Sequence, residues 1–165
     1  MRKWFVFLLA ALLLCACGAQ PTFETVDDED SLLVSASNRE VELELPKEAA
    51  KPTMESADNG SLYLCNGYVL TIQTFSGGDL NRTMQQLTGY TQPQLQYIRR
   101  KTANADKYEL VWSAAGEGGD QVARAVILDD GQNHYAVTVM ADADTAGQLQ
   151  STWQKLLGSV KLGTD

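Results

Sequence analysis

The sequence predicts an α+β domain in which two main helices pack on a single twisted antiparallel sheet. Three observations support this fold class. Apolar and polar side chains alternate along most of the chain after residue 31, as in strands with one wet face. Short turns rich in Gly, Asn and Asp separate these runs, and two stretches change to the helical spacing of three and four residues. The chain has 165 residues, 44% of them hydrophobic, so one packed domain is expected.

The first strands are predicted on either side of a proline-containing segment. Apolar residues alternate with glutamates over residues 41–45, and Pro46 ends this strand. Residues 31–36 are a candidate hairpin partner for it. Further on, Asn66-Gly67 is the favoured pair for a type I′ turn, because both central positions of that turn need positive φ. The turn joins two predicted strands, residues 61–65 and 68–75.

A change of spacing marks the first helix. Leu80, Met84 and Leu87 fall on one helical face, while Asp79 can cap the start of the helix and Gly89 can end it. Four strands are predicted after this helix, and "GEGGD" and "DDGQN" separate the last three as hairpin loops. These strands are residues 95–101, 107–114, 121–129 and 134–141.

The second helix is predicted over residues 142–158, followed by a short strand at "SVKL". Apolar residues recur there at steps of three and four, an acidic start suits the helix dipole, and Gly158 favours the end. Both predicted helices have one apolar stripe, which must be buried against the apolar face of the sheet.

The N-terminus predicts a secretory signal. Arg2 and Lys3 precede an apolar run over residues 4–14, which spans only about 16 Å as a helix and is too short to cross a bilayer. A positive start, a short apolar stretch and small residues after it are typical of signal peptides. A plain signal peptide and an uncleaved anchor are the alternatives to the processing described next.

The stretch "LCAC" (residues 14–17) resembles the lipobox of bacterial lipoproteins. This resemblance implies cleavage between Ala16 and Cys17, thioether lipidation of Cys17 and acylation of the new amino terminus. Several acyl chains anchor a protein stably in a membrane, whereas one binds only marginally. The chain is therefore expected to consist of a signal peptide (1–16), an acidic flexible tether (17–30) and an α+β domain (31–165), held outside the cytoplasm on a bacterial membrane.

Charge limits the classes of partner. The chain has a net charge of −8, and without Arg2 and Lys3 the balance is −10, which opposes binding to nucleic acid. Five of the acids lie close together in residues 24–30 and keep that segment extended by repulsion, with calcium binding as the alternative.

A few residues in the domain raise questions of chemistry. With Cys15 removed and Cys17 lipidated, no intramolecular disulfide is expected. Cys65 and His134 could form a nucleophile pair, although a half-buried thiol and an ordinary strand histidine are the simpler interpretation. One Cys and one His do not suggest a zinc site, and no metal or cofactor is expected. Three other features have two interpretations each: residues 129–133 as a calcium loop or a hairpin turn, residues 99–101 as a basic docking site or a protected strand edge, and Trp112, Tyr135 and Trp153 as a pocket or core.

From residue 40 to residue 162 the layout resembles the PsbP-like fold. The resemblance rests on "LYLCNGYVLTIQTF", on the strand pair that includes "YELVWSAAG", and on the closing "WQKLLGSVKL". It implies the fold and brings no catalytic motif. The leading hypothesis is a lipid-anchored, non-enzymatic accessory protein that binds an envelope protein partner. The second is a small-molecule or ion-binding module associated with a transporter, and the third is a hydrolase using Cys65 and His134.

Overall fold

The computed structural model describes residues 39–49, 51–56, 60–116 and 118–163. These belong to a compact unit, Ala36–Asp165. The predicted signal peptide, the tether and the candidate strand 31–36 lie outside the described residues.

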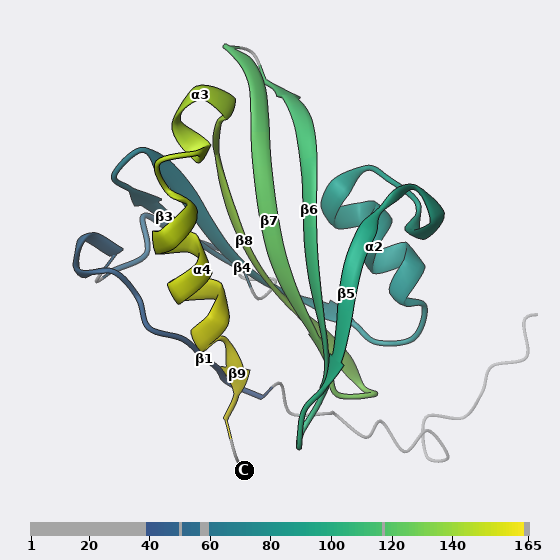
Figure 1. Cartoon of the computed structure of the whole chain (residues 1–165). Helices are drawn as coiled ribbons and strands as arrows, with labels where there is room; N and C mark the ends of the chain where they lie inside the picture. The colour runs from purple at the N-terminus through teal and green to yellow at the C-terminus, as the bar shows by residue number, and fades with distance from the viewer. Residues whose placement is uncertain (1–38, 50, 57–59, 117, 164–165) are drawn as a thin grey trace, which may run out of the picture. The chain divides into compact units, whose positions relative to one another are not determined.

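A large antiparallel sheet dominates this unit (Figure 1). Its seven strands follow the order β2-β3-β4-β8-β7-β6-β5, and a separate two-stranded sheet pairs β1 with β9. The prediction of one single sheet is therefore wrong in this detail, while the α+β class with a large antiparallel sheet is confirmed. The strands are β1 (Val41–Glu42), β2 (Met54–Ser56), β3 (Gly60–Cys65), β4 (Tyr68–Ser76), β5 (Gln96–Lys101), β6 (Asp106–Gly116), β7 (Gly119–Asp129), β8 (Asn133–Asp142) and β9 (Lys161–Leu162).

Two runs of neighbouring strands are joined in the middle of the sheet. The predicted hairpin is β3–β4, turning at Asn66 and at Gly67, which has φ +82°. The predicted four-strand run is β5–β6–β7–β8. Pairing of β4 with β8, from Val69 opposite Met140 to Ser76 opposite Asn133, joins the two runs. Strand β2 was not predicted from the sequence; it extends the sheet beyond β3.

The short strand β1 pairs with the last strand of the chain. Val41 lies opposite Leu162, and the N–H of Gly163 donates to the Glu40 carbonyl oxygen at 2.9 Å. Two hydrogen bonds of Arg39 also hold the start of the domain against its end and against β8. The Arg39 N–H donates to Tyr135 Oη at 3.0 Å, and Nη2 donates to the Gly163 carbonyl oxygen at 2.9 Å. The first and last described segments of the domain therefore lie side by side.

The first main helix, α2 (Leu80–Thr88), has the predicted ends. The Asp79 carboxylate accepts from the N–H of Asn81 at 2.9 Å, and Gly89 closes the helix at φ +79° with its N–H on the Gln85 carbonyl. A 3₁₀ turn, η2 (Gln92–Gln94), then leads into β5, and an earlier one, η1 (Lys47–Ala49), precedes β2.

The second predicted helix is divided into α3 (Ala143–Ala146) and α4 (Gln150–Ser159). Between them the hydrogen bonds tighten to the i→i+3 pattern: Gln148 N–H donates to Thr145, and Leu149 N–H donates to Ala146. The α-helical pattern resumes where Trp153 N–H donates to Leu149. The expectation of one continuous helix over 142–158 is therefore wrong, and Gly147, a poor helix former, lies at the break.

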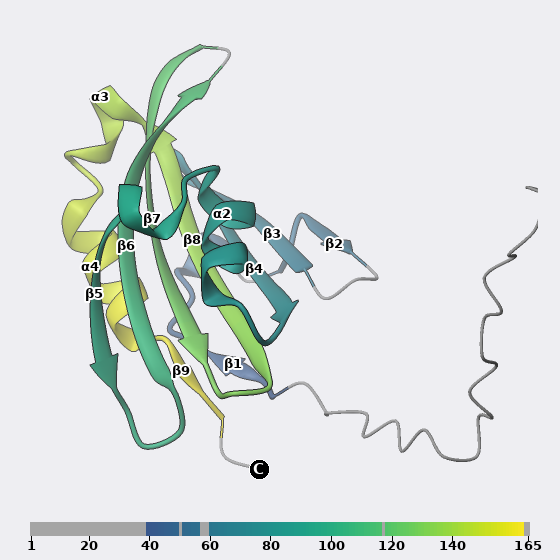
Figure 2. The ribbon, with the colours of Figure 1, turned by 90° about the vertical axis from the view of Figure 1, so that its right-hand side faces the viewer.

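Helices α2 and α4 lie on opposite faces of the sheet (Figures 1 and 2). Strand β8 contributes side chains to the cores under both helices, because its successive side chains point to opposite faces of the sheet. Tyr135, Trp112 and Trp153 are 0%, 7% and 1% exposed, so all three are core residues. The α4 core includes Leu70, Tyr135, Val137, Val139, Trp153 and Leu156, and the α2 core includes Met84, Tyr108, Leu110, Trp112, Ala123 and Ile127.

Candidate functional site

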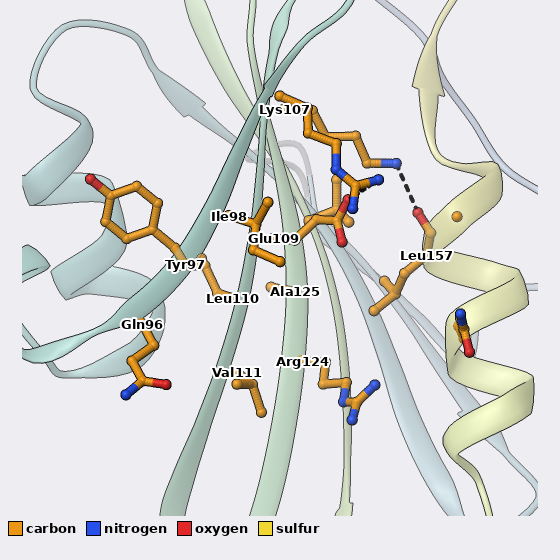
Figure 3. A pocket seen from close by; sticks show the side chains of 14 residues that line it. Gln96, Tyr97, Ile98, Lys107, Glu109, Leu110, Val111, Arg124, Ala125 and Leu157 are labelled. Carbon is orange, nitrogen blue, oxygen red and sulfur yellow. Dashed lines mark hydrogen bonds and ion pairs between the residues drawn. The ribbon is translucent and has the colours of Figure 1, made fainter.

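A groove of about 670 Å³ lies on the α4 face of the sheet, between α4 and strands β5, β6 and β7 (Figure 3). Strands β5 and β6 extend beyond α4 on this face (Figure 1), so part of the sheet has no helix over it. Three residues of α4 form the helical wall: Gln154, Leu157 and Gly158.

Strand register sets the floor of the groove in three rows. Directly opposed residues of antiparallel strands point to the same face. The first row therefore contains Gln96, Val111 and Arg124, the second contains Ile98, Glu109 and Val126, and the third contains Arg100 and Lys107. Figure 3 shows this succession from Arg124 at one end to Lys107 at the other. Four residue steps along β6 give the floor a length of about 13 Å.

Apolar side chains are open to solvent on this floor. Ile98 is 54% exposed and Val111 is 47% exposed, while Leu157 on the wall is buried. The main-chain N–H and C=O groups of β6 form hydrogen bonds with β5 on one side and β7 on the other. A ligand at the centre of the floor can therefore contact only side chains.

Lys107 is almost buried at the end of the groove. Its Nζ donates to the carbonyl oxygen of Leu157 at 3.1 Å (Figure 3) and to that of Val160 at 3.3 Å, at the C-terminal end of α4. A cation stabilises this negative end of a helix. Burial lowers the pKa of Lys107, the carboxylate of Glu109 opposes the shift, and Arg100 adds to it. Lys107 therefore positions the helical wall against the sheet.

The other charged side chains of the floor differ in the interactions that they make. Arg100 Nη1 lies 3.5 Å from Glu109 Oε1, with the Arg100 side chain 63% exposed, so this pair contributes little stability. Arg124 is half-buried and points into the groove (Figure 3), and no hydrogen bond or ion pair joins its side chain to another described residue. Three cations and one carboxylate line this groove in a chain of net charge −8.

The geometry separates Cys65 from His134. Cys65 lies opposite Tyr68 and His134 opposite Phe75, at the two ends of β4, about 23 Å apart along the sheet. They also face different layers, because Cys65 packs beside the α4 core whereas His134 Nδ1 lies 2.7 Å from Thr83 Oγ1 on α2. The interpretation of these two residues as a nucleophile pair is therefore wrong.

The loop at residues 129–133 is a hydrogen-bonded hairpin turn. Asp130 Oδ1 accepts from the N–H groups of Gln132 and Asn133, and Oδ2 accepts from the Tyr135 hydroxyl at 3.1 Å. Burial raises the pKa of Asp130, but these hydrogen bonds outweigh burial and the net shift is downward. Both carboxylate oxygens of Asp130 thus accept hydrogen bonds, one from the turn and one from Tyr135 of β8. Within the described ranges, no group of three or more His, Cys, Asp or Glu residues is placed to hold a metal ion.

The basic cluster of residues 99–101 lies on β5, at the edge of the sheet. Arg99 Nη2 lies 2.6 Å from Asp106 Oδ2 and its guanidinium stacks 5.8 Å from the Tyr108 ring centre, on the α2 face. Arg100 points to the other face and belongs to the groove. Charged side chains on an edge strand discourage pairing with another chain.

Sequence reasoning missed Arg124 and Lys107. A signal was present for Arg124, because it interrupts an otherwise apolar face of β7 formed by Val122, Val126 and Leu128. Cys17 and Ala16, the predicted lipidation and cleavage residues, lie outside the described residues. Among the helices that the structure describes, none combines the length and the apolar character needed to cross a bilayer.

Comparison by sequence identifies no relative, because no protein-family model matches the chain and no curated protein matches it significantly. Comparison of structures finds chains that are similar. A crystal structure from Bacteroides thetaiotaomicron VPI-5482 matches with a TM-score of 0.52 and 11% identity, over 76% of this chain and 46% of that chain. This chain thus spans about half the length of that neighbour. At such low identity the match shows a shared fold alone.

Two further solved structures are similar to the chain. LpqN of Mycobacterium tuberculosis, which is involved in cell envelope biogenesis, matches with a TM-score of 0.49 and 12% identity, over 77% of this chain and 85% of that chain. The cyanobacterial PsbP, CyanoP, of Synechocystis sp. PCC 6803 matches with a TM-score of 0.45 and 10% identity, over 78% of this chain and 96% of that chain. Both TM-scores are below one half, so membership of the PsbP-like family stays a prediction.

Proposed function

We propose that the protein is a lipid-anchored binding protein of the bacterial envelope, which acts outside the cytoplasm and without catalysis, and that the groove beside α4 is its binding site. The observation that supports this is the floor of the groove, where exposed Ile98 and Val111 lie among the side chains of Arg100, Glu109 and Arg124. Binding sites commonly combine an apolar surface with a few converging polar groups.

The groove suits a small ligand better than an extended polypeptide. Its volume of about 670 Å³ is within the range of small-molecule sites. An extended segment lying on the centre of this floor would bury its own N–H and C=O groups, and the β6 main chain has no group left to pair with them. This favours the small-molecule hypothesis over protein binding at the floor.

Native mass spectrometry of protein purified from its own envelope tests the binding function. We expect a small molecule to accompany the wild-type protein and to be lost from Val111→Trp, which fills the floor. Leu64→Trp is the matched control, because Leu64 is also an exposed strand residue, at 58%, and does not line the groove. Equal retention by both variants would place the ligand elsewhere, and absence of any bound molecule from wild type would count against the function.

The anchor has its own test. Cys17→Ala should release the protein from membranes in fractionation experiments, whereas Cys15→Ala, the matched control two residues away, should leave it attached. Firm retention of a processed Cys17→Ala protein would show that the lipobox interpretation is wrong.

Binding of an envelope protein is the second candidate function. It is favoured by β5, an edge strand whose six residues are all exposed. The basic residues 99–101 of this strand discourage pairing with most chains, so a partner strand that pairs with its outer edge would have to be acidic. A pull-down from native membranes with the lipidated protein tests this, and failure to recover a reproducible protein partner would count against it.

A further inference from the structure

We propose that the ligand is an anionic amphiphile with one apolar chain, whose carboxylate or phosphate head binds Arg124 and whose chain lies along the floor of the groove. This proposal rests on the proposed binding function of the groove and adds the chemical class of the ligand and the residue that selects it.

Arg124 is the group that selects an anion. A guanidinium carries five N–H donors in a planar fork that matches carboxylate and phosphate oxygens. The Arg124 residue is half-buried beside Val111, and no described residue gives its guanidinium a hydrogen bond or an ion pair. The guanidinium is therefore open to an anionic head, and charge-assisted hydrogen bonds to such a head are stronger than those between neutral groups.

The other cations of the groove are already engaged. Lys107 donates to two carbonyl oxygens at the end of α4, and Arg100 has the carboxylate of Glu109 3.5 Å away, whose negative charge repels an anion. Arg124 lies at the opposite end of the floor from Lys107 (Figure 3), so the head group has one preferred position at one end of the groove.

The floor between these ends explains why the ligand carries an apolar chain. From the row of Arg124 the floor runs for about 13 Å past Val111 and Ile98, with Leu157 on the wall. Covering Val111 and Ile98, each about half exposed, removes apolar surface from water, and this contribution is absent for a small inorganic anion. The net negative charge of the chain also disfavours anions that have no such apolar contact.

Isothermal titration calorimetry of the full lipidated chain in phosphatidylcholine nanodiscs tests the proposal. The probes are octanoate, octyl phosphate, octyl glucoside and acetate, all below micelle-forming concentrations, with empty nanodiscs as the partition background. We expect octanoate or octyl phosphate to bind, and the tighter of the two identifies the head. Acetate should bind at least about tenfold more weakly, because it lacks the apolar chain.

Two variants test the residue assigned to the head. Arg124→Gln should weaken binding of the anionic amphiphile by about tenfold to a hundredfold, the value of a hydrogen bond to a charged group, and should leave octyl glucoside unaffected. Val111→Glu keeps Arg124 but places a carboxylate on the neighbouring strand directly opposite Arg124. This carboxylate should compete with the anionic head for Arg124 and weaken binding of the amphiphile. Arg82→Gln, an exposed arginine on α2 outside the groove, is the matched control and should bind as wild type does.

The outcomes separate this proposal from the function on which it rests. If octyl glucoside binds as tightly as octanoate and Arg124→Gln changes nothing, the anionic head is refuted while the groove remains a binding site. If acetate binds as tightly as octanoate, the apolar chain is refuted. If no amphiphile binds, the ligand class is refuted, and the bound molecule sought by native mass spectrometry decides the function separately.

Discussion

The hydrogen bond between Thr83 and His134 joins α2 to the sheet and gives the sharpest stability prediction. Thr83 is 3% exposed and His134 is 1% exposed, and Thr83 Oγ1 lies 2.7 Å from Nδ1. We assign the ring proton to Nε2, which lies 3.7 Å from the Asp129 carboxylate, so that Nδ1 is the acceptor. The Thr83 hydroxyl therefore donates to the ring.

Thr83→Val keeps the shape of the side chain and removes the donor. It leaves a ring nitrogen without a partner at a site that water does not reach, which costs about 1–3 kcal/mol. Since both side chains are almost fully buried, we expect about 2 kcal/mol, equivalent to a fall in Tm of roughly 6–10 °C for a domain of this size. Urea unfolding followed by circular dichroism measures the change in the free energy of unfolding.

Thr138→Val is the matched control. Thr138 is also buried on β8, at 5% exposure, but its hydroxyl has no hydrogen-bond partner among the described residues. Replacing that hydroxyl with a methyl group should be neutral or stabilising. In a His134→Leu background, Thr83→Val should lose most of its effect, because no ring nitrogen remains to lose its donor. If Thr83→Val is as mild as Thr138→Val, the reasoning about this bond is refuted.

Three further predictions concern single substitutions, each measured by chemical denaturation. Burial lowers the pKa of Lys107 in the folded state, so the charged side chain destabilises the folded protein at neutral pH. This destabilisation disappears as pH rises from the folded pKa to the ordinary lysine pKa, where the side chain loses its proton. Wild type should therefore gain stability relative to Lys107→Met between neutral pH and the ordinary lysine pKa, and an unchanged difference would contradict this. Gly77→Ala should cost about 2–3 kcal/mol, since the new Cβ would lie 2.2 Å from the Gln132 carbonyl oxygen; a neutral result would contradict that contact. Gly158→Ala meets open space in α4 and should stabilise by about 0.5–1 kcal/mol, and destabilisation would be the contrary result.

Local patterns predicted most of the fold. Alternation along the strands, Asn66-Gly67 at the turn, and the caps Asp79 and Gly89 are properties of short segments, and the structure has them. The errors arose where distant segments decide. The partner of β1 is the end of the chain, and the break at Gly147 accompanies a helix that must start at the end of β8 and then run back over the sheet. Neither can be read from neighbouring residues.

The groove could not be predicted for the same reason. It exists because α4 covers only part of one face, which depends on where α4 packs rather than on its own sequence. Lys107 shows the difficulty: in the sequence it is a polar position in a strand, and only the fold brings it to the carbonyl groups of Leu157 and Val160. Arg124 was accessible to sequence reasoning, since a lone cation on an apolar strand face requires an explanation.

The pairing of β1 with β9 has a mechanical consequence. The proposed anchor would apply a pull from the N-terminal side of Arg39, next to the β1–β9 pair. That pull meets the hydrogen bonds of Arg39 to Tyr135 and Gly163, and then the two-residue ladder of Val41 and Glu42 with the C-terminal strand. The force is thus distributed over the C-terminal strand β9 and the central strand β8. A domain loaded in this way should yield first by peeling of β1, before the strands that carry the groove are disturbed.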